Sequence, residues 1–383
     1  MTLAGAPPFP RPTGGHRRKP HQPLHAAQPI QFTTQWRFMC IARSGNNNSN
    51  DNPLNSSTAL DLRNKLQQAD ERIRTTEFVP QSSGPASWEY LCGQYVRRPA
   101  SRAWGAVHFT GGAILGSFPH IAYSALLEAV AEQAQVIVIA SPFDVSKDHQ
   151  ELSEQCDSSF KRALYAVCDA DGYDFAQLPM ISLGHSLGSK LQLLSSCSRT
   201  VPKASTVLIS FNNASAADTV GLVERFAKRI ATERSSGYTG QLFSSLADAL
   251  PAGVSEAVSA AARAAGVEFT PWPEQTLSIA QSSFTNSQQR LDLIQLEDDD
   301  LDMGNTLASS LREARNSVSV HMHSLPGNHL TPVCTRVSAQ QMSTGSSELD
   351  EQLGTLQGLT LGDETAVNAL ASLVSSIIAR AGR

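Results

Sequence analysis

Hydrophobic and polar positions follow two rhythms along the central part of the chain. Short, continuous apolar runs at residues 136–140 and 204–210 are typical of strands buried on both faces of a parallel sheet. Longer segments with apolar residues at helical spacing lie at 121–133 and 147–167. Because such runs and segments alternate regularly, the pattern predicts an α/β fold, a doubly wound, mostly parallel sheet with helices on both faces.

Further strands and helices extend this alternation in both directions, with one interruption. Residues 214–289 are rich in Ala, Ser and Leu at helical spacing, which predicts a helical cap inserted into the α/β domain. The other expected strands are 88–97, 104–109, 178–183, 290–296 and 317–323, and the other expected helices are 55–76, 304–316 and 364–380.

The same pattern divides the chain into parts. Residues 86–337 form the predicted α/β domain, and residues 51–85 precede it as an N-terminal extension. Residues 338–383 follow it as a Gly- and Ser-rich linker and a closing amphipathic helix. Residues 1–50 differ from all of these in composition.

Residues 1–50 contain no Asp or Glu, yet they carry six Lys or Arg residues among many Pro, His, Gln, Asn and Ser. Such a composition cannot bury a hydrophobic core. An acid-free, Arg-bearing leader without a long apolar region is typical of organelle transit peptides. We therefore expect import into an organelle and cleavage between Arg43 and Asn55, and the alternative is a disordered tail without a targeting role.

Charge and cysteine usage narrow the classes of function. The net charge over the 383 residues is −5, and no stretch of basic residues is interleaved with aromatic residues. We therefore expect no nucleic-acid partner. The six cysteines show no C-x-x-C pair and no metal-ligand spacing, so we expect reduced thiols, no metal and no cofactor. No apolar run approaches the ~18 residues that span a bilayer. We expect no transmembrane segment, and peripheral contact with a membrane stays open.

The strongest chemical signal is a G-x-S-x-G motif at residues 184–188. An apolar strand-like run precedes it and a helix-like segment follows it. In that context Gly184, His185 and Gly188 are expected to form a nucleophile elbow, a sharp turn that lifts the hydroxyl of Ser186 clear of the sheet. The alternative is a plain Gly/Ser turn.

A serine nucleophile needs a base, and only three histidines follow Ser186 in the chain. His321 and His323 lie on a predicted strand and should face the same side of the sheet. His329 lies in the turn-rich loop after that strand, where catalytic groups are usually carried. We predict that His329 is the general base, and the alternative is an exposed loop histidine.

The acid that orients the base should stand just after the strand at 290–296. Five carboxylates occur there within residues 297–302, and most of them must be solvated loop side chains. Position favours Asp299, with Asp298 and Asp300 as alternatives.

Two backbone amides should hold the oxyanion in such a site. Leu187, directly after the nucleophile, supplies one. The loop after the strand at 104–109 supplies the other through Gly112 or, alternatively, Ala113; its sequence does not fit a phosphate-binding loop. Asn212 and Asn213, at the end of the strand at 204–210, either place an amide near the pocket or form an Asn-rich turn.

The chain from residue 86 to about residue 335 resembles the α/β-hydrolase superfamily and, within it, the domain-of-unknown-function 1350 family of plants, algae and cyanobacteria. Five strings carry the resemblance in the expected order: HFTGGA at 108–113, GHSLG at 184–188, LISFNN at 208–213, IQLEDDDLD at 294–302 and LPGNHLTP at 325–332. The resemblance implies an α/β-hydrolase fold and favours the chloroplast over the mitochondrion as the destination of the leader. It implies no substrate.

These residues together predict a serine hydrolase that cleaves an ester, thioester or amide of a small molecule or lipid through a Ser-Asp-His triad and an acyl-enzyme. Acyl transfer to an alcohol is the nearest chemical variant. The alternative from another class is a non-catalytic binding or assembly protein that keeps the fold, because a fold does not imply a function.

Overall fold

The computed structural model describes residues 88–113, 116–198, 203–216, 218, 268–284, 290–314, 318–336 and 360–382. All of them belong to one compact unit, residues 52–383. The predicted transit peptide, the expected helix at 55–76, most of the predicted cap and most of the linker that follows residue 337 lie outside the described residues.

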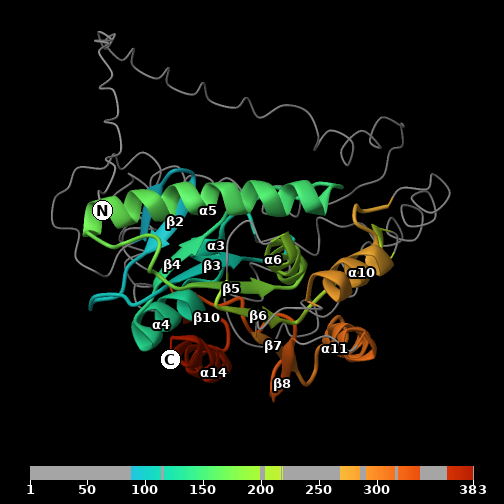
Figure 1. The fold of residues 1–383 in the computed structure, drawn as a ribbon. Helices are drawn as coiled ribbons and strands as arrows, with labels where there is room; N and C mark the ends of the chain where they lie inside the picture. The colour runs from blue at the N-terminus through green and yellow to red at the C-terminus, as the bar shows by residue number, and fades with distance from the viewer. Residues whose placement is uncertain are drawn as a thin grey trace, which may run out of the picture. The chain divides into compact units, whose positions relative to one another are not determined.

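The described core is built on one eight-stranded sheet (Figure 1). Its strand order is β1-β2-β4-β3-β5-β6-β7-β8. β2 runs antiparallel to both of its neighbours, and every pair from β4 to β8 is parallel. This is the α/β-hydrolase fold that the sequence predicts. The strands are β1 Trp88–Leu91, β2 Gln94–Arg97, β3 Ala106–Thr110, β4 Ile137–Ala140, β5 Met180–His185, β6 Ser205–Ile209, β7 Arg290–Leu296 and β8 Ser319–Leu325.

Helices cover both faces of this sheet (Figure 1). Side chains alternate along β3, so that Val107 and Phe109 face one layer while Ala106 faces the other. The first layer contains α4 and α14, and the second contains α5, α6, α10 and α11. The helices are α3 Pro119–Ala122, α4 Ser124–Ala134, α5 His149–Asp171, α6 Leu187–Ser198, α10 Pro273–Phe284, α11 Gly304–Glu313 and α14 Glu364–Ala381.

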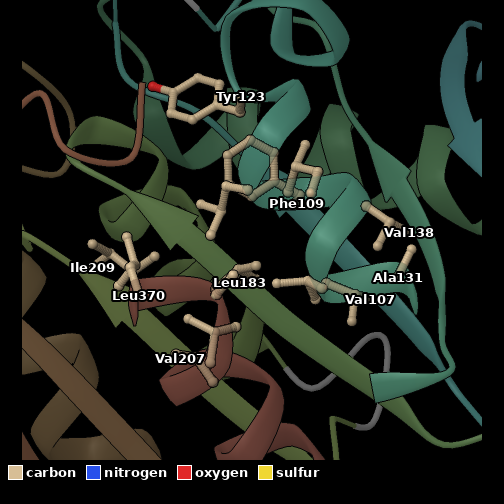
Figure 2. Close-up of a cluster of buried hydrophobic side chains, with 14 of the residues drawn as sticks. Val107, Phe109, Tyr123, Ala131, Val138, Leu183, Val207, Ile209 and Leu370 are labelled. Atoms are coloured by element: carbon tan, nitrogen blue, oxygen red, sulfur yellow. The ribbon is translucent and has the colours of Figure 1, made fainter. Parts of the chain in front are cut away.

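The largest apolar cluster lies between the sheet and the pair α4 and α14 (Figure 2). Val107, Leu183 and Val207 from three neighbouring strands are fully buried against Ala131 of α4 and Leu370 of α14. Burial of aliphatic side chains of this size contributes about 1.5–3 kcal/mol each. This layer therefore anchors β3, β5 and β6, the strands that lead to the loops of the candidate site.

Local signals set the ends of the long helices. Asp148 caps α5 by accepting a hydrogen bond from the amide of Glu151 at 2.8 Å, and the helix ends at Gly172 with φ 68°. Asp363 caps α14 in the same way, accepting from the amide of Ala366 at 2.9 Å. α5 thus extends four residues beyond the helix that the hydrophobic pattern at 147–167 predicts.

The start of the sheet differs from the prediction. The expected single strand at 88–97 is a hairpin, β1 and β2, because Cys92 and Gly93 take positive φ angles of 52° and 81° and reverse the chain. β3 does not join this hairpin and pairs in parallel with β4 and β5 instead.

A second, two-stranded antiparallel sheet pairs β9 Thr335–Arg336 with β10 Thr360–Leu361. None of the described helices is long and apolar enough to cross a membrane.

Candidate active site

Ser186 stands alone between β5 and α6 in a strained conformation. Its φ of 57° lies in the left-handed region, which non-glycine residues rarely occupy. The amide of Ser186 donates to the carbonyl of Ile209 at 3.1 Å, so the neighbouring strand β6 holds the turn. The strand, the sharp turn and the helix are those of the elbow that the G-x-S-x-G motif predicts.

The two glycines of the motif are required by close approach of the backbone. A Cβ atom on Gly184 would lie 2.6 Å from the carbonyl oxygen of Gly188. A Cβ atom on Gly188 would collide with the carbonyl oxygens of Thr110 and Gly111. Both clashes are with main chain, which cannot swing aside as a flexible side chain can.

His329 joins Ser186 and Asp299 in one line of hydrogen bonds. Its Nε2 atom lies 2.9 Å from the Oγ of Ser186, and its Nδ1 atom lies 2.8 Å from the Oδ2 of Asp299. A carboxylate only accepts, so Nδ1 carries the proton and Nε2 is the acceptor for the serine hydroxyl. This is the tautomer that a general base requires.

The topology of the sheet explains why residues so far apart in sequence meet. β5, β7 and β8 run parallel, so their carboxyl ends share one edge of the sheet, and Ser186, Asp299 and His329 each follow one of these strands. Two backbone bonds join the loops after β7 and β8: the amide of Glu297 donates to Leu325, and the amide of Asp298 donates to Gly327.

Asp299 is held from both sides. Its Oδ1 atom accepts from the amide of Leu301 at 2.9 Å while Oδ2 is bonded to His329. Burial opposes the charged form, but the hydrogen bond from His329 and the other bonds to the carboxylate outweigh burial and lower the pKa of Asp299. The alternatives Asp298 and Asp300 are exposed side chains of the same loop.

The loop that carries His329 is fixed by its own side chains. The amide of Asn328 donates to the Oγ1 of Thr331 at 2.9 Å, and the side-chain oxygen of Asn328 accepts from the amide of Leu330 at 2.8 Å. Gly327 takes a φ of 137°, which lets the chain turn from β8 into this loop. His329 itself is 7% exposed, so water has limited access to its ring.

The structure corrects the expectation for Gly112. Its amide donates a hydrogen bond to the Oη of Tyr123 at 2.8 Å, so this N–H is engaged within the protein. The amide of Leu187, the first residue of α6, has no acceptor within its own helix, as expected at a helix start. Ala113 is half-buried in the turn that the Gly116 amide closes on the Gly112 carbonyl at 2.7 Å.

His108 and His323 have contacts outside the line from Ser186 to Asp299. His108 stacks on Phe160, and its Nε2 lies 2.8 Å from the Oγ of Ser141; burial lowers the pKa of His108 to about 4. His323 bonds to the buried carboxylate of Asp292 at 2.8 Å. None of these groups contacts Ser186.

Asn212 and Asn213 use their side-chain amides to fasten neighbouring segments. Asn212 donates to the carbonyl of Leu301 in the acid loop at 3.2 Å. Asn213 donates to the carbonyl of Pro273, at the start of α10, at 2.9 Å. Asn212 thereby supports the acid loop, and Asn213 holds the start of α10.

Sequence reasoning missed Tyr123 and Ser210, and it placed His185 in the elbow without foreseeing the contacts of its ring. Tyr123 and Ser210 carry no motif, and His185 fills the variable position of the G-x-S-x-G motif. Ser210 follows β6 with a φ of 49°, and its buried hydroxyl lies near enough to Asp299 to lower the carboxylate's pKa further, without a hydrogen bond of good geometry. A non-glycine residue with positive φ is visible only in the structure.

The described residues contain no group of three or more His, Cys, Asp or Glu side chains placed to hold a metal ion.

Comparison with solved structures finds similar chains at low identity. A thermostable esterase from Pseudomonas putida shares 13% identity with a TM-score of 0.44, covering 88% of this chain and 99% of that one. Carboxyl esterase 2 from Tuber melanosporum shares 14% identity with a TM-score of 0.41, covering 75% and 80%. A thioesterase domain from the curacin biosynthetic pathway shares 15% identity with a TM-score of 0.36, covering 73% and 94%.

A search of curated protein sequences gives no match. The family model described as "Protein of unknown function (DUF1350)" matches residues 87–355, which include strands β1 to β8, the elbow, the acid loop and the histidine loop. The chain belongs to the DUF1350 family.

Proposed function

We propose that the protein is a serine hydrolase that cleaves an ester, thioester or amide through an acyl-enzyme. The observation that carries the proposal is the line of hydrogen bonds from Ser186 through His329 to Asp299, at 2.9 and 2.8 Å. The strained φ of Ser186 supports it, because strain of this kind at a non-glycine residue clusters at functional sites.

In the first half of the reaction, the Oγ of Ser186 attacks the carbonyl carbon of the substrate as the Nε2 of His329 takes the hydroxyl proton. A tetrahedral intermediate forms with its charge on the former carbonyl oxygen. The intermediate collapses, the bond to the leaving group breaks, and His329 returns the proton to the departing alcohol, thiol or amine. Asp299 holds the ring in the productive tautomer and stabilises its transient positive charge.

In the second half, water replaces the leaving group. His329 takes a proton from the water as its oxygen attacks the acyl carbon. The second tetrahedral intermediate expels the Oγ of Ser186, which regains the proton from His329. The products are a carboxylic acid and the free enzyme.

Two amides are proposed to bind the oxyanion, those of Leu187 and Ala113. Leu187 lies at the start of α6, where an unpaired amide and the helix dipole both favour negative charge. Ala113 takes the second place because the amide of Gly112 is bonded to Tyr123. Loss of one such donor costs ~3 kcal/mol of transition-state stabilisation.

Hydrolysis of short p-nitrophenyl esters by the purified full chain tests the proposal. We expect turnover by the wild type and its loss in Ser186→Ala. Ser282→Ala, which removes the hydroxyl of an exposed serine of α10, is the matched control and should retain full activity. A folded wild type that hydrolyses no ester, thioester or amide of a broad panel would favour a non-catalytic binding protein.

A further inference from the structure

Tyr123 connects two loops of the candidate site through one hydroxyl group. It lies at the junction of α3 and α4 and is 1% exposed. Its ring packs edge-on against Phe109, and Figure 2 shows its hydroxyl oxygen pointing out of the apolar cluster. That oxygen lies 2.8 Å from the amide of Gly112 and 2.9 Å from the Nδ1 of His185.

His185 continues the connection to the base. Its Nε2 atom lies 3.0 Å from the backbone carbonyl oxygen of His329, and the two imidazole rings are 4.9 Å apart. His185 also directly precedes Ser186 in the chain. One buried side chain therefore neighbours the nucleophile in sequence and holds the main chain of the base.

The direction of every hydrogen bond from Gly112 through Tyr123 and His185 to His329 follows from donor and acceptor chemistry. The carbonyl of His329 only accepts, so the Nε2 of His185 must carry a proton. Burial lowers the pKa of His185 to about 3, so its ring is neutral and Nδ1 accepts. Tyr123 therefore donates to His185 and accepts from Gly112, which satisfies every polar atom along the chain.

We infer that Tyr123 and His185 are positioning residues: through this chain of hydrogen bonds they hold the backbone of His329, and hence its imidazole, in line with Ser186. The inference rests on the proposed function. The same chain ties the base to the loop of Gly112, whose next residue is the proposed oxyanion donor Ala113. The hydrogen bonds thereby fix the position of the base, His329, relative to the proposed oxyanion donor, Ala113.

A structural role for Tyr123 can be separated from this positioning role. Tyr123→Phe keeps the ring that packs on Phe109 and removes both hydrogen bonds of the hydroxyl. His185→Leu removes donor and acceptor, whereas His185→Gln keeps one of each. Tyr173→Phe is the matched control, because Tyr173 also accepts from a backbone amide, that of Ala103 at 3.0 Å, before β5 and away from the elbow.

The experiment measures the rate constant with which a fluorophosphonate labels Ser186 in the full chain. We expect Tyr123→Phe and His185→Leu to slow labelling about tenfold each, as for the loss of a hydrogen bond of ordinary strength. Their double variant should be no slower than the slower single variant, because both break the same chain. His185→Gln should recover most of the rate, and Tyr173→Phe should label as fast as the wild type.

If the wild type is labelled and folded Tyr123→Phe is labelled at the same rate, the inference is overturned and the proposed function stands. Multiplicative losses in the double variant would also overturn it. A wild type that does not label at all would contradict the proposed function itself. Should a variant fail to fold, nitrogen-15 NMR of the wild-type histidine rings decides instead: we expect a neutral His185 protonated on Nε2, and an Nδ1-protonated ring would refute the assigned chain.

Discussion

The Nε2 atom of His329 lies 2.9 Å from the Oγ of Ser186, although the two residues are 143 positions apart in the chain. Each follows a strand of the same parallel sheet, and the carboxyl ends of those strands share one edge. The apolar layer of α4 and α14 secures β5, and paired backbone bonds secure the loops after β7 and β8. The contact is thus a product of the whole fold.

Asp299→Asn should reduce ester hydrolysis by on the order of 10³- to 10⁴-fold without unfolding the protein. An amide in place of the carboxylate favours the wrong tautomer of His329 while it preserves the shape of the site. The measurement is kcat for a p-nitrophenyl ester, with circular dichroism to verify the fold.

Asp298→Asn provides the control for this substitution, since its side chain is exposed in the same loop. Its activity should stay within about twofold of wild type, as for most exposed substitutions away from a site. Equal losses in the two variants would show that the charge of the loop matters and that Asp299 has no special role.

Stability should fall as the pH drops below about 6.5, the pKa of an unperturbed histidine. Burial lowers the pKa of His108 to about 4, and of His149 and His185 to about 3. Between these values and pH 6.5 each of these histidines is protonated in the unfolded state and neutral in the folded state. Each one therefore lowers the free energy of unfolding by about 1.4 kcal/mol for every pH unit of acidification. Above pH 7 these groups are neutral in both states and the contribution is constant. Urea unfolding at successive pH values gives the slope.

His149→Phe should reduce the slope of stability against pH by the equivalent of about one bound proton, or about 1.4 kcal/mol per pH unit. Both ring nitrogens of His149 are buried without a partner among the described residues, and the ring stacks on Phe269, so an apolar ring suits the place. A slope identical to that of the wild type would exclude His149 as a source of the acid sensitivity.

Gly188→Ala should destabilise the protein by about 3 kcal/mol or more, since the new Cβ meets two backbone carbonyl oxygens. Gly172→Ala is the comparison: Gly172 has a φ of 68° but nothing within 4 Å, so only backbone strain of about 1–2 kcal/mol applies. Urea denaturation of both variants measures the difference, and equal losses would show that the close approach at Gly188 costs no more than the backbone strain at Gly172.

Residues 1–50, fused to a fluorescent reporter, should carry it into the chloroplast of a plant or algal cell, because an acid-free, Arg-bearing leader is typical of transit peptides. Accumulation in mitochondria would support the alternative organelle. Reporter that stays in the cytosol would refute a targeting role.

Local patterns predicted most of the fold and the members of the line from Ser186 to Asp299. β7 has the bounds that its apolar run indicates, and the order of elbow, acid loop and histidine loop follows from strands that carry clear signals. Such features depend on neighbours in sequence, which a pattern can record.

The rest depends on contacts that no local pattern contains. The sequence around Gly112 is compatible with an oxyanion donor, but in the structure the amide of Gly112 is hydrogen-bonded to the hydroxyl of Tyr123. Tyr123 lies at the junction of two helices, a position that has no periodic signal in the sequence. The positive φ of Cys92, which divides one expected strand into a hairpin, is likewise unexpected for a residue with a side chain. In both places tertiary geometry, which no local pattern records, gave a result different from the one that the sequence favoured.

The most direct test of the central claim is the mass of the intact protein after reaction with a fluorophosphonate, followed by peptide mapping. The account predicts one adduct, on Ser186, with no adduct in Ser186→Ala or His329→Ala although both remain folded. A folded wild type that gains no mass, or an adduct on another serine that persists in Ser186→Ala, would contradict an activated nucleophile at the elbow.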